Sequence, residues 1–97
     1  MDVRSFAPEF VQRGNKLLEQ GDLEGALSAY DTAVRIQADL PEAHLGRGMV
    51  LWRQGNLFEA LAAFSIGLAF RPDIPEAHFY RGLILEELGK HEEAAGA

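Results

Sequence analysis

The sequence reads "PEAHLGRGMVLW" at residues 41–52 and "PEAHFYRGLILE" at residues 75–86, two stretches that begin 34 residues apart. They share Pro-Glu-Ala-His, then Arg-Gly, then a leucine. A third, more diverged copy with the same spacing begins at Ala7. A fixed period of this length is the signature of a repeat architecture, in which one structural unit is stacked several times.

Small residues recur at fixed places in the repeat. They form three aligned sets: Gly14, Gly48 and Gly82; Gly21, Gly55 and Gly89; Ala26, Ala60 and Ala94. An aromatic position joins them, since Tyr30 aligns with Phe64. A glycine inside a helix costs about 1 kcal/mol relative to alanine. Its recurrence at one place therefore predicts that two helices approach closely there, with the aromatic ring filling the space beside them.

Each unit is predicted to be a pair of helices. In the middle unit, Pro41 and the acidic residue after it favour a helix start. Apolar residues follow with helical spacing, and Gly55 predicts the end of this first helix. A second helix is predicted up to Pro72, because proline cannot continue a helix. One such hairpin cannot bury its apolar face alone, so the units are expected to stack.

The period and this framework of small and aromatic residues resemble the tetratricopeptide repeat. The resemblance covers the chain from about residue 7 to residue 97. It implies an all-α fold, a right-handed α-α superhelix (solenoid) of stacked helical hairpins. Residues 1–97 would form a single domain with repeats at 7–40 and 41–74 and a partial repeat at 75–97.

The sequence departs from the family pattern at several positions. Ala38 stands where the family has its closing proline, and His44 and His78 stand at a usually aromatic position. An arginine replaces the usual leucine before the first glycine in all three units: Arg13, Arg47 and Arg81. We expect these arginines to form a ladder with neighbouring carboxylates, worth about 0–1 kcal/mol for a surface pair.

The third unit is incomplete. Its first helix is expected at about residues 76–88, which leaves only "HEEAAGA" for the second. A full second helix would cover three apolar residues, so we expect an exposed apolar end at Ile84, Leu85 and Leu88. Either the chain is a fragment of a longer protein or something else covers this end. One alternative function is therefore self-association through these residues, as a homodimer or larger oligomer.

Composition limits the function classes. The chain has 97 residues and a net charge of −6, which disfavours binding to nucleic acid. It has no cysteine, which excludes disulfides and thiolate metal sites. The first residues do not form a signal peptide, and the most apolar stretch, residues 57–70, is too short to cross a bilayer. A cytoplasmic location is expected.

No arrangement of catalytic residues is apparent. None of the three serines lies in a Gly-x-Ser-x-Gly turn, and "HEEAA" from His91 lacks the second histidine of the zinc-protease motif. His44 and His78 lie one repeat apart, on the order of 10 Å. That separation is too large for two ligands of one zinc ion, which sit ~2 Å from the metal. We expect no enzyme activity, metal, cofactor or small-molecule substrate, and a packing role for both histidines.

In the family, the first helices of successive repeats line a concave groove that holds a peptide or helix of a partner. The resemblance implies the following groove residues here: Val11, Asn15, Leu45, Met49, Trp52, Arg53, Phe79, Tyr80 and Glu86. This mixture of apolar, aromatic and acidic residues suits an amphipathic helix or an extended apolar peptide with some basic residues. The resemblance therefore implies a protein–protein scaffold or adaptor.

The best-known function of the family is a clamp for the C-terminal carboxylates of heat-shock chaperones. The clamp needs lysines at Val11 and Glu76, asparagines at Asn15 and Gly46, and an arginine at Tyr80. Only Asn15 matches. A bound carboxylate would lack its charged donors here, so we do not expect a chaperone clamp.

Overall fold

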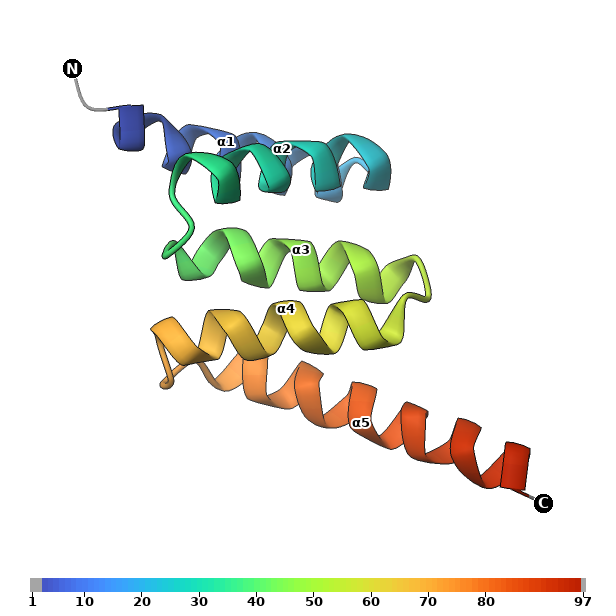
Figure 1. The fold of residues 1–97 in the computed structure, drawn as a ribbon. Coiled ribbons are helices and arrows are strands. Elements are labelled where there is room, and N and C mark those ends of the chain that lie inside the picture. The colour runs from blue at the N-terminus through green and yellow to red at the C-terminus, as the bar shows by residue number, and fades with distance from the viewer. Residues whose placement is uncertain (1–2, 97) are drawn as a thin grey trace.

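The computed structural model describes residues 3–96, and within the last helix it describes side chains as far as Lys90. A short 3-10 helix, η1 (Val3–Phe6), precedes five α-helices: α1 (Ala7–Glu19), α2 (Leu23–Ile36), α3 (Pro41–Arg53), α4 (Leu57–Phe70) and α5 (Pro75–Gly96). Successive helices run antiparallel and stack in chain order from one end of the molecule to the other (Figure 1). The predicted all-α superhelix of stacked hairpins is confirmed. None of these helices is both long enough and apolar enough to span a membrane.

The turns within the first two hairpins depend on glycine. Gly21 and Gly55 have φ angles of +80° and +82°, in the left-handed region that residues with a Cβ rarely adopt. Asp22 follows the first of these turns, and its carboxylate accepts a hydrogen bond from the backbone N–H of Gly25 at 2.9 Å. This contact caps the start of α2. Between hairpins, Pro41 and Pro75 occupy the first positions of α3 and α5.

The core has two layers, each centred on one aromatic ring. The Tyr30 ring of α2 lies against Gly14 of α1, where an added Cβ would be 2.7 Å from the ring, and it lies closer still to Gly46 of α3. The Phe64 ring of α4 covers Gly48 in the same way, with an added Cβ 2.9 Å away. The predicted close approach of helices at the recurring glycines is confirmed in these two hairpins.

The third unit differs from the prediction. A first helix ending near residue 88 was expected, but α5 runs without a break from Pro75 to Gly96 (Figure 1). Gly89, which aligns with the two turn glycines, does not have a positive φ. Asp22 caps the helix that follows the first turn, whereas Asn56 after the second turn makes no side-chain cap hydrogen bond, and Gly89 is followed by Lys90, which cannot cap a helix. Continuing the helix keeps the backbone hydrogen bonds that an uncapped turn would lose.

The expected apolar end is also only partly exposed. Ile84 is fully buried, and Leu88 is partly buried against the same cluster of residues from α3 and α4. These two residues are one turn apart, so they share the face of α5 that packs on the preceding hairpin. The expectation of exposure is therefore wrong for Ile84, while Leu85, at 45% exposed, does lie on the surface.

Candidate protein-binding groove

A cavity of about 320 Å³ is lined by residues from all the first helices, α1, α3 and α5. Five of the residues that the sequence suggested lie in it: Val11, Asn15, Leu45, Met49 and Tyr80. We call this cavity the groove. Leu45 and Met49 share one face of α3 because they are four residues apart. The groove is thus an apolar surface shared by three helices that are separate in sequence.

Four suggested residues do not line the groove. Trp52 packs against Tyr80 with ring centroids 5.1 Å apart and belongs to the core layer around Phe64. Phe79 is 63% exposed and contacts Tyr80 edge to face. Arg53 is exposed at the end of α3, and Glu86 lies on the surface of α5, 3.6 Å from the ammonium group of Lys90.

Several residues that line the groove were not among those suggested. They are Tyr30, Glu42, Gly46, Phe64, Ile74, Glu76 and Ala77. Tyr30 and Phe64 reach the groove from α2 and α4, so the assignment to first helices alone missed them. Glu42 and Glu76 carried a signal in the sequence, because both follow the recurring proline and both fall at the start of a first helix.

A hydrogen bond joins the base of the groove to its wall. The hydroxyl of Tyr30 donates to the side-chain oxygen of Asn15 on α1. Burial raises the pKa of the Tyr30 hydroxyl; Arg53 opposes this shift, and Glu19 adds to it. The hydroxyl therefore stays a neutral donor near neutral pH and holds Asn15 in place.

The opposite end of the groove is acidic. One carboxylate oxygen of Glu42 is 2.8 Å from the guanidinium of Arg71, and the other is buried without a hydrogen-bond partner among the described residues. Glu76, at the corresponding position of α5, has no ion-pair partner among the side chains described and is exposed. An apolar groove with an uncompensated carboxylate at one end can accept a cationic group there.

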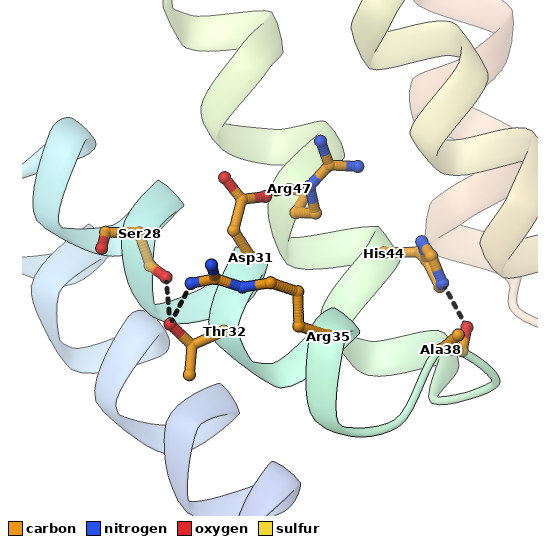
Figure 2. Close-up of polar contacts among 7 residues, drawn as sticks. All are labelled: Ser28, Asp31, Thr32, Arg35, Ala38, His44 and Arg47. Atoms are coloured by element: carbon orange, nitrogen blue, oxygen red, sulfur yellow. Dashed lines mark hydrogen bonds and ion pairs between the residues drawn. The ribbon is translucent and has the colours of Figure 1, made fainter.

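The recurring histidines hold the turns between hairpins. The Nε2–H of His44 donates to the backbone carbonyl of Ala38 at 2.6 Å (Figure 2), and His78 does the same to the carbonyl of Pro72 at 2.6 Å. In each case the acceptor lies six residues earlier, in the turn that leads into the helix. His44 is 5% exposed and also stacks on Phe70 with ring centroids 5.9 Å apart.

The aligned arginines do not form the uniform ladder that was expected. Arg47 of α3 pairs with the carboxylate of Asp31 on α2 (Figure 2). Arg81 of α5 instead donates to the hydroxyl of Ser65 on α4 at 3.2 Å. Arg13 lies over the ring of Phe10, 4.9 Å from its centroid. The first two tie each hairpin to the next, but only Arg47 does so through a carboxylate.

Comparisons with known families agree with this architecture. A family model described as TPR repeat matches residues 14–55, and one described as tetratricopeptide repeat matches residues 59–97. No curated protein matches the sequence. Together with the stacked hairpins and the glycine–aromatic contacts, these matches identify the chain as a member of the tetratricopeptide repeat family.

Proposed function

We propose that this protein is a non-catalytic adaptor whose groove holds an apolar, basic segment of another protein. Tetratricopeptide repeats in general mediate protein–protein interaction. One observation carries the proposal: the groove joins an apolar lining from three helices to the exposed carboxylate of Glu76, which has no ion-pair partner among the described side chains.

The apolar part of the groove suits a hydrophobic anchor. Leu45, Met49 and Tyr80 line it and are all partly exposed, so a partner side chain placed among them would remove more of their surface from water. Burial of this kind contributes about 25 cal/mol per Å² of apolar area. A volume of about 320 Å³ lies at the lower end of ordinary ligand sites, which suits one or two side chains of a partner.

The acidic end suits a lysine or arginine next to that anchor. A hydrogen bond between a cationic side chain and a carboxylate is stronger than a neutral hydrogen bond, and an exposed pair of this kind is worth about 0–1 kcal/mol. Glu42 is already paired with Arg71, which leaves Glu76 as the favoured acceptor. The partner segment would therefore place its basic residue near the N-terminus of α5.

Two features argue against a chaperone clamp. An asparagine at Gly46 would collide with the Tyr30 ring, because even a Cβ there would be too close. Glu76 would repel the terminal carboxylate of a chaperone peptide. A partner with a free acidic terminus is thus disfavoured by both shape and charge.

The proposal is tested by measuring the affinity for a fluorescent amphipathic peptide made of leucine and lysine. We expect saturable binding, and no binding of a matched leucine and glutamate peptide. Glu76→Lys should weaken binding about tenfold, equivalent to the loss of about 1.4 kcal/mol. The matched control is Glu24→Lys, which makes the same change of charge at an exposed residue of α2 outside the groove.

A second variant separates the groove from simple charge attraction. Met49→Gln removes apolar groove surface without any change of charge, so it should also weaken binding. Equal losses for Glu76→Lys and Glu24→Lys, with no effect of Met49→Gln, would mean that the peptide binds the acidic surface non-specifically, and the proposal would fail.

A further inference from the structure

We infer that a second surface, formed by His78, Gly82 and Leu85 of α5, is a docking site for a helix of another protein that carries an aromatic residue between small residues. We call it the Gly82 face. Its residues are spaced i, i+4 and i+7 and so form one stripe along the helix. Gly82 is two positions from Tyr80, or about 200° around the helix, so the stripe faces away from the groove. The inference thus goes beyond the proposed function.

The repeat supplies an internal comparison for this face. The equivalent stripe on α3 is His44, Gly48 and Leu51, and all three residues are buried. His44 is 5% exposed and Leu51 is 3% exposed. On α5, by contrast, His78 and Gly82 are exposed and Leu85 is 45% exposed. The same pattern is therefore covered in one unit and open in the other.

The completed hairpins indicate what covers such a stripe. On α3 the cover is α4, whose Phe64 ring lies on Gly48 and whose Phe70 ring stacks on His44. On α1 the cover is α2, whose Tyr30 ring lies on Gly14. At Gly82 an added Cβ would have no atom within 4 Å, so the place of the aromatic ring is empty. α5 continues straight past Gly89 and, as far as Lys90, does not fold back over this face.

The covering helices share one pattern of side chains. A small residue lies four positions before the aromatic and another lies three positions after it, and all are buried: Ala26, Tyr30 and Ala33 in α2; Ala60, Phe64 and Gly67 in α4. The small residues let the helices approach until the ring contacts the facing glycine. A partner for the Gly82 face is thus a helix with the pattern small-x3-aromatic-x2-small.

A second copy of this chain does not supply that helix. Tyr30 and Phe64 are buried in their own hairpins, so exposing either ring to bind another copy would disrupt a core layer. The exposed phenylalanines lack the flanking pattern, because the residue four positions earlier is never small: it is Asp2 for Phe6, Gln54 for Phe58, Ile66 for Phe70 and Pro75 for Phe79. Among the described residues, no other helix of this chain offers a free ring in this pattern, so the occupant that we infer is a helix of a different protein.

The test uses a helix that is known to fit an equivalent stripe. The probe is a synthetic peptide with the sequence of residues 22–37, labelled with a fluorophore. A cross-link between the residues that correspond to Glu24 and Ser28, both exposed on α2, keeps the peptide helical. We expect saturable binding to the full chain. Replacing Tyr30 by alanine in the peptide should weaken binding more than about tenfold, because the ring is its central anchor.

The protein variant Gly82→Gln should also weaken binding more than about tenfold, because its side chain fills the place of the ring. The variant should keep the melting temperature of the wild type or exceed it, because Gly82 is open and glutamine is a better helix former. Glu87→Gln, on another side of α5, is the matched control and should bind normally. Glu76→Lys should also bind the probe normally, so a failure of the groove proposal is distinguishable from a failure here.

Absence of binding, or equal binding by wild type and Gly82→Gln, would overturn the inference. A second experiment measures the molar mass of the chain alone in solution by light scattering. A dimer that Gly82→Gln dissociates would show that a second copy occupies the face, which would overturn the assignment to a different protein.

Discussion

At the scale of single residues, the glycines at the helix crossings determine how closely each hairpin packs. Gly48 has the Phe64 ring directly above it, whereas the equivalent Gly82 has open space. The same residue in the same repeat position therefore meets two different environments. This difference makes the pair an internal control for packing.

The first prediction compares Gly48→Leu with Gly82→Leu. Gly48→Leu should lower the free energy of unfolding by about 1–3 kcal/mol, because the new side chain overpacks the core. Gly82→Leu should leave stability unchanged or raise it by up to about 1 kcal/mol, the difference in helix propensity. Urea denaturation followed by circular dichroism measures both. Similar effects of the two substitutions would contradict the placement of the Phe64 ring.

The second prediction concerns Tyr30 and pH. Because burial raises the pKa of Tyr30 in the folded state above its ordinary value of 10.0, the unfolded chain loses this proton first as the pH rises. The contribution of Tyr30 to stability should be fully present below about pH 10 and decline above it. Tyr30→Phe should cost about 1 kcal/mol at neutral pH, through the lost hydrogen bond to Asn15.

Melting temperatures of the wild type and Tyr30→Phe across alkaline pH check this prediction. The difference between the two proteins should shrink as the pH passes 10. A constant difference would show that the Tyr30 hydroxyl titrates as it does in the unfolded chain.

At the scale of elements, the two recurring histidines fasten the turn before each first helix. Both donate to a carbonyl six residues earlier, but His44 is covered by α4 and His78 is open to solvent. The hydrogen bond of His44 is part-buried, whereas that of His78 is exposed, so water replaces the donor less readily at His44. The two turns should therefore depend on their histidines to different degrees.

The third prediction follows from this contrast. His44→Ala should lower the free energy of unfolding by about 1–3 kcal/mol, because it removes a part-buried hydrogen bond together with a buried ring that stacks on Phe70. His78→Ala should cost less, because water can reach the carbonyl of Pro72. Thermal melts of the two variants give the comparison, and an equal or larger loss for His78→Ala would contradict the proposed role of the turns.

How much of the fold follows from the sequence also differs between elements. The ends of α1 to α4 are marked locally, by Pro41, by Gly21 and Gly55 with their positive φ angles, and by the cap at Asp22. The break that was expected near residue 88 of α5 is not marked in this way. Gly89 carries the repeat pattern, but Lys90 after it cannot cap a following helix. The match of Gly89 to the repeat therefore predicted a turn that does not form, because the residue after the glycine also matters for starting the next helix.

The sequence predicted only some of the groove residues, for a related reason. Repeat spacing places residues on the correct face of a first helix, which suffices for Leu45, Met49 and Tyr80. It does not reveal which long side chains bend toward a neighbour, as Trp52 does toward Tyr80. It also does not reveal that Tyr30 reaches through from the second helix, because glycines on both sides leave it room.

At the scale of the whole molecule, the helices stack in one direction and each packs mainly on its neighbours (Figure 1). In such arrays stability is approximately a sum of units and interfaces, so the elements with one neighbour open first. α3 lies between α2 and α4, and its Val50 and Leu51 belong to different core layers. α5 packs mainly on α4 and reaches α3 through Tyr80, and no later helix among the described residues covers its other side.

The fourth prediction is a gradient of amide hydrogen exchange. Amides of α3 should exchange slowest, at rates governed by global unfolding, and those of α5 should exchange faster through local opening. Exchange followed by mass spectrometry or nuclear magnetic resonance resolves the two helices. Uniform protection across α3 and α5 would indicate a single cooperative unit without this order.

The measurement that tests the central claim most directly is a nuclear magnetic resonance titration of the isotope-labelled chain with the leucine and lysine peptide. Saturable shifts should be concentrated at groove residues, above all Leu45, Met49, Glu76 and Tyr80. Resonances along the exposed face of α2 should stay unchanged. Shifts spread evenly over the acidic surface, or centred on α2 and α4, would contradict the claim that the groove between α1, α3 and α5 is the binding site.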